Sequence, residues 1–153
     1  MPTLSVRDVL KLIGRFHSRL AERYGELADT AGEPRVRMLA VSMADAEARL
    51  SRCWLQPSDP DGTDRVLGYW FSVAPIVPGD LNLDDLDLSS DITSEALMDT
   101  ALRLDERLAA LCRRIADGCT SPAVRELFLN LAEQEEGEER RTARATLSAE
   151  LDQ

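Results

Sequence analysis

Five side chains that can bind metals or transfer protons interrupt the apolar patterning of this sequence. They are His17, the only histidine, together with Glu47, Asp105, Glu135 and Glu138. Each stands where apolar residues recur every three or four positions, which is the spacing of the buried face of a helix. An isolated carboxylate in such a place is costly unless it is paired, protonated or bound to a cation. The pattern therefore indicates a polar site inside a helical core.

An internal repeat places these residues at matched positions. Residues 15–52 align without a gap onto residues 103–140 at an offset of 88, with 13 of 38 positions identical. The offset pairs His17 with Asp105, Glu47 with Glu135, and Leu50 with Glu138. Because each half is predicted to be a helix hairpin, the repeat predicts that the polar residues lie at the same depth in both halves.

The elements that position these residues are four helices, expected over 5–30, 34–54, 94–118 and 122–148. Ser5 with Asp8 resembles a capping box, and Thr93 is a suitable N-cap. Residues 1–153 are expected to form one all-α domain, a four-helix bundle. Two hairpins, 5–54 and 94–150, are joined by a long crossover over 55–93. We call this crossover the strap.

The predicted charge balance of the core favours a bound cation. His17 can carry one positive charge, which does not neutralise four carboxylates, and no lysine or arginine lies on the same stripes. Asp105, Glu135 and Glu138 form an all-oxygen set in the second half. Oxygen ligands favour hard cations such as Mn²⁺, Mg²⁺ or iron.

The segments 23–28 and 124–136 resemble the ferritin-like superfamily, and within it the rubrerythrin branch. In that family, helices one and three each give a glutamate, and helices two and four each give an ExxH motif. His17 and Asp105 stand at the glutamate positions. Glu47 begins a first motif whose histidine position is Leu50, and Glu135 begins a second motif whose histidine position is Glu138.

This resemblance implies a metal site built from His17, Glu47, Asp105, Glu135 and Glu138. It implies one or two ions of iron or manganese, with a role in oxygen- or peroxide-linked redox chemistry or in iron handling. It also implies a homodimer. The loss of both motif histidines predicts weaker iron binding than the family pattern supports.

A metal-free arrangement is the alternative. Protonated His17 between Glu47 and Asp105 would satisfy most of these groups, and Glu135 and Glu138 would belong to a solvated acidic face. The protein would then be a degenerate ferritin-like bundle, acting as a structural or protein-interaction module without a cofactor. The apolar run 66–77 of the strap would either cover its own bundle or meet a protein partner.

Composition narrows the classes of partner. The net charge of −10 argues against nucleic acid, whose phosphates favour lysine and arginine. No apolar run reaches the roughly 20 residues needed to span a bilayer. The three cysteines, at 53, 112 and 119, include no CxxC pair and suit a reducing compartment. We expect a cytoplasmic protein.

Overall fold

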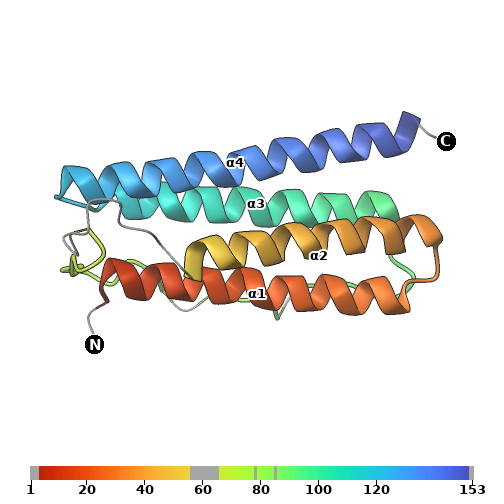
Figure 1. The fold of residues 1–153 in the computed structure, drawn as a ribbon, viewed down its shortest axis with the longest axis horizontal. Helices are drawn as coiled ribbons and strands as arrows, with labels where there is room; N and C mark the ends of the chain where they lie inside the picture. The colour runs from red at the N-terminus through yellow and green to blue at the C-terminus, as the bar shows by residue number, and fades with distance from the viewer. Residues whose placement is uncertain (1–3, 56–65, 78, 85, 152–153) are drawn as a thin grey trace. The chain divides into compact units, whose positions relative to one another are not determined.

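Four helices make up most of the described chain. The computed structural model describes residues 4–55, 66–77, 79–84 and 86–151, although not the side chains of 138–140 and 142–151. The helices are α1 (Val6–Thr30), α2 (Pro34–Leu55), α3 (Ser94–Asp117) and α4 (Pro122–Leu151) (Figure 1). Within those ranges no strand forms beyond one isolated bridge, between Ser5 and Trp70. The prediction of an all-α fold is confirmed.

The first residues of the helices follow from local chemistry. Ser5 Oγ accepts a hydrogen bond from the Asp8 amide, and the Asp8 carboxylate accepts one from the Ser5 amide, which completes the predicted capping box. The hydrogen bond from the Ser5 backbone also holds the pKa of Asp8 below its usual value. Thr93 caps α3 through the Ala96 amide, as predicted.

Each hairpin forms a compact unit. The first unit, Met1–Ile92, contains α1, α2 and the strap, and the second, Thr93–Gln153, contains α3 and α4. The same contact closes both turns: Arg37 donates to the Ala31 carbonyl oxygen at 2.9 Å, and Arg125 donates to the Cys119 carbonyl oxygen at 2.7 Å. These donors and acceptors are related by the offset of 88. A guanidinium thus satisfies carbonyl oxygens that the helix end leaves without a partner.

The strap runs along α1 from its first residue to its last turn. Near the start of α1, the amides of Val6 and Arg7 donate to the carbonyl oxygens of Tyr69 and Leu67. Further along, the side chains of Arg19 and Arg23 donate to the carbonyl oxygens of Leu81 and Leu86. After the end of α1, the Gly32 amide donates to the Ser90 carbonyl oxygen. The strap therefore supplies acceptors for amides that the first turn of a helix leaves open.

The apolar run of the strap is divided between core and surface. Leu67 and Phe71 are buried, whereas Trp70 is 61% exposed and Val73 is 77% exposed. The run therefore covers part of the first hairpin and also presents apolar side chains to solvent. Among the described residues, no helix is both long enough and apolar enough to cross a membrane.

Two glycines of α1 give a matched test of this packing. A Cβ at Gly14 would lie 2.8 Å from Leu55 Cγ and 3.2 Å from the Leu55 amide nitrogen, whereas a Cβ at Gly25 would meet nothing within 4 Å. We expect Gly25→Ala to raise the free energy of unfolding by about 0.5–1 kcal/mol, because alanine loses less backbone entropy in a helix. Gly14→Ala should lower it by about 1 kcal/mol, because α2 must move away. Urea denaturation of both variants measures the difference, and equal shifts would contradict the close approach of the helices.

Candidate metal centre

The candidate residues with described side chains are all buried. His17 and Glu135 are fully buried, Asp105 is 4% exposed and Glu47 is 8% exposed. They come from α1, α4, α3 and α2 respectively. Their neighbours at helical spacing are apolar and buried as well, at positions 13, 20, 50, 101, 108, 128 and 132. The helices therefore direct these polar groups inward, as the stripes predicted.

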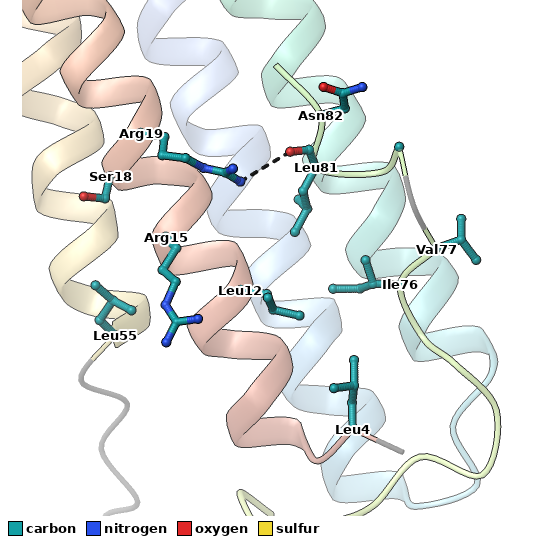
Figure 2. A pocket seen from close by; sticks show the side chains of 11 residues that line it. Leu4, Leu12, Arg15, Ser18, Arg19, Leu55, Ile76, Val77, Leu81 and Asn82 are labelled. Carbon is teal, nitrogen blue, oxygen red and sulfur yellow. Dashed lines mark hydrogen bonds between the residues drawn. The ribbon is translucent and has the colours of Figure 1, made fainter. Parts of the chain in front are cut away.

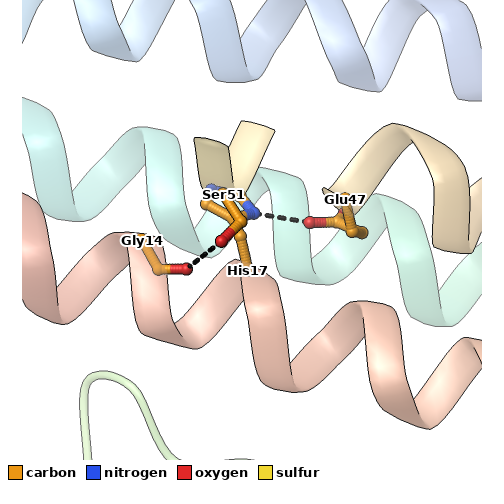
Figure 3. Close-up of polar contacts among 4 residues, drawn as sticks. All are labelled: Gly14, His17, Glu47 and Ser51. Carbon is orange, nitrogen blue, oxygen red and sulfur yellow. Dashed lines mark hydrogen bonds and ion pairs between the residues drawn. The ribbon is translucent and has the colours of Figure 1, made fainter. Parts of the chain in front are cut away.

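His17 and Glu47 form a direct pair between α1 and α2. Their Nδ1 and Oε2 atoms are 2.5 Å apart, and both side chains are buried (Figure 3). A carboxylate on one ring nitrogen favours the proton at Nδ1, which makes Nε2 the nitrogen through which His17 would bind a metal. This geometry corresponds to the carboxylate–histidine pairs that orient metal ligands. Glu47 thus holds the imidazole in place.

A second polar contact lies one helical turn away from this pair. Ser51 Oγ donates to the Gly14 carbonyl oxygen at 2.9 Å, and Ser51 is buried (Figure 3). Ser51 follows Glu47 by four residues and Gly14 precedes His17 by three, so both contacts lie on the same faces of α1 and α2. Sequence reasoning missed Ser51. Its spacing of four from Glu47 was the available signal.

Aromatic rings enclose the imidazole. The rings of Phe16 and Trp54 each have their centroids 6.0 Å from that of His17. Trp54 is 2% exposed, and its Nε1 makes no hydrogen bond with any described residue. Burial beside these two rings lowers the local dielectric, which strengthens the interaction between His17 and Glu47.

In the second unit, Glu135 lies near a buried thiol. Cys112 of α3 is fully buried, and burial raises the pKa of its thiol to about 12. The negative charge of Glu135 adds to this rise, while Arg113 opposes it. At neutral pH Cys112 is therefore a neutral thiol that packs as a small apolar side chain, since only the thiolate is a strong nucleophile or metal ligand. Asp105 stands one heptad earlier on the same helix.

Two of the five predicted metal-site residues are in contact in the structure, and the grouping of all five stays a prediction. The structure brings His17 and Glu47 into contact, and it buries Asp105 and Glu135 in the second unit. Glu138 lies in α4, but its side chain is outside the described part of the chain. Across the residues that are described, no three histidine, cysteine or acidic side chains gather as a metal-binding group.

Comparison with known proteins supports the fold. No model of a known protein family matches the sequence, and no curated protein matches it. A crystal structure from Thermotoga maritima is similar to this chain with a TM-score of 0.61 and 17% sequence identity, over 94% of this chain and 95% of that one. That protein is described, provisionally, as a ferritin-like diiron-carboxylate protein. The chain therefore has the ferritin-like four-helix fold.

The three thiols should differ sharply in reactivity. Cys53 is exposed, whereas Cys112 and Cys119 are buried and the pKa of each is raised, mainly by burial. With an aromatic disulfide reagent at pH 8, we expect one thiol per chain to react rapidly in the folded protein and three to react in denaturant. Cys53→Ser should remove the rapid phase. A second rapid equivalent in the folded wild type would show that a buried thiol is accessible.

Proposed function

We propose that this protein is a divergent rubrerythrin-like metal-binding protein that holds one or two ions of iron or manganese inside its helical bundle. The observation that carries the proposal is the burial of one imidazole and three carboxylates at positions paired by the internal repeat. His17 pairs with Asp105 and Glu47 pairs with Glu135 in the alignment, and all four side chains are buried. Three acids against one base leave a negative excess that a divalent cation would balance.

The donor chemistry of these residues fits such an ion. His17 would bind through Nε2, because Glu47 engages Nδ1. Asp105, Glu135 and Glu138 would supply oxygen ligands, which iron and manganese accept. A bound iron or manganese ion would supply the redox chemistry of oxygen or peroxide, or would be the cargo of an iron-handling protein.

The chain's own contribution is to hold and enclose the site. Glu47 and the flanking rings of Phe16 and Trp54 fix the orientation of the imidazole. Full burial of His17 and Glu135 keeps bulk water away from their donor atoms. The diiron-carboxylate description of the similar Thermotoga maritima protein supports iron as the first metal to test.

One observation favours a second candidate function. The short hydrogen bond between His17 and Glu47 gives each group a partner without a metal, as a degenerate bundle would require. Such a protein would act as a structural or interaction module. It would form a homodimer or bind a protein partner through the exposed side chains of the strap run, among them Trp70, Val73 and Val77.

Metal binding should depend on the buried acids and not on acidity in general. In the double variant Glu47→Gln and Glu135→Gln, we expect at least a tenfold loss of Fe(II) or Mn(II) affinity by anaerobic calorimetry. The control carries Asp45→Asn and Glu133→Gln, which remove exposed carboxylates from the same two helices. It should bind as the wild type does. Equal binding by all three proteins would contradict the proposed site.

A thermal melt of Asp105→Leu separates the two candidate functions. If the bundle is metal-free, neither Fe(II) nor Mn(II) should change the melting temperature of the wild type or of this variant. If the site binds metal, added Fe(II) or Mn(II) should stabilise the wild type more than the variant. A wild type whose melting temperature does not respond to either ion would contradict the metal-binding function.

A further inference from the structure

A groove lies on the first unit, away from the buried His17–Glu47 pair. It runs between α1 and strap residues 76–77 and 79–82, with a volume of about 800 Å³ (Figure 2). That volume is within the range of small-molecule sites. Its apolar lining consists of Leu4, Leu12, Leu55, Ile76, Val77 and Leu81, and its polar side chains are those of Arg15, Ser18, Arg19 and Asn82.

The charge of this groove is opposite to that of the chain. The sequence has 28 acidic and 18 basic residues, yet the lining includes two arginines and no carboxylate. Asp80 is the nearest acid along the strap, and its carboxylate accepts a hydrogen bond from the Val77 amide at 2.8 Å. The groove is thus complementary to an anion, in a protein whose net charge of −10 repels anions elsewhere.

The two arginines have donors to offer a ligand. Arg15 and Arg19 stand one turn apart on α1, and both are exposed. Arg15 makes no hydrogen bond or ion pair to the described residues, and Arg19 donates to the Leu81 carbonyl oxygen at 3.5 Å. A guanidinium carries five N–H donors and binds carboxylates bidentately. Either guanidinium could therefore hold one carboxylate.

Arginine and aliphatic side chains lie beside one another along the groove. Arg19, Leu81 and Asn82 lie toward one end and Leu4 toward the other, with Arg15 at the level of Leu12 and Ile76 and its guanidinium directed away from that of Arg19 (Figure 2). A ligand that fits this arrangement has one anionic head and one unbranched apolar chain.

We propose that the groove binds a free fatty acid, with its carboxylate at Arg15 and its chain over Leu12 and Ile76. A site of this kind is independent of the proposed metal centre, because none of its lining residues belongs to that set. It gives the protein a second ligand, which would bind whether or not the buried site holds a metal ion.

Calorimetry with dodecanoate below its critical micelle concentration tests the proposal, on the protein as purified and again with a chelator present. We expect saturable binding in both conditions. Dodecyltrimethylammonium keeps the chain and reverses the charge of the head, and butanoate keeps the head and shortens the chain. Each should bind at least tenfold more weakly, because the site requires both parts of the ligand.

Variants assign the binding to the groove. Arg15→Gln should weaken dodecanoate binding about fivefold, and the loss should shrink at high salt. Ile76→Gln should weaken binding by a similar factor through the apolar end. Arg49→Gln removes an exposed arginine from α2, outside the groove, and should bind as the wild type does. Circular dichroism checks that each variant keeps its helices.

Three results would overturn the proposal. The first is the absence of saturable dodecanoate binding. The second is equal binding of the cationic amphiphile, which would indicate a non-specific apolar surface. The third is an equal loss in Arg15→Gln and Arg49→Gln, which would indicate a general charge effect.

Discussion

The cost of burying charge constrains this molecule more than any other interaction. His17 and Glu47 lie in the apolar interior of the first hairpin, where either one alone would be strongly destabilising. Removing one partner of a buried pair typically costs about 3–5 kcal/mol. The pair therefore fixes how α1 and α2 face each other, and Ser51 repeats that constraint one turn away by bonding to Gly14. A metal-binding role would build on a hairpin already held in this way.

The strap stabilises the first unit through hydrogen bonds to α1. Its carbonyl oxygens accept hydrogen bonds from the opening amides of α1 and from the side chains of Arg19 and Arg23. Polar contacts at both ends of α1 thus hold this connection, whose residues 66–77, 79–84 and 86–93 form no helix and no strand beyond the single bridge at Trp70. Strap residues 76, 77, 79, 81 and 82 also form one wall of the groove beside Arg15. One long connection therefore caps a helix and creates a surface site.

The two hairpins use residues at repeat-related positions for the same structural roles. Arg37 and Arg125 each bond to a carbonyl oxygen of the preceding turn, and Glu47 and Glu135 are each buried on the following helix. The two hairpins differ in the surroundings of the buried polar residues at the first paired position, His17 and Asp105. His17 is paired by a carboxylate at short range, whereas Asp105 shares its helix with the neutral thiol of Cys112. A nitrogen donor on one side and oxygen donors on the other make an asymmetric set.

The sequence by itself determined the helices, their caps and the inward direction of the candidate residues. Those features depend on neighbours within a few positions: Ser5 with Asp8, or His17 between apolar residues one turn away. Only the tertiary structure decided that Glu47 contacts His17 Nδ1, that Ser51 bonds to Gly14, and that the strap follows α1. It also brought Arg15 and Arg19 into one groove with Ile76 and Leu81. These contacts join residues 30 or more positions apart, and no local pattern specifies such pairings.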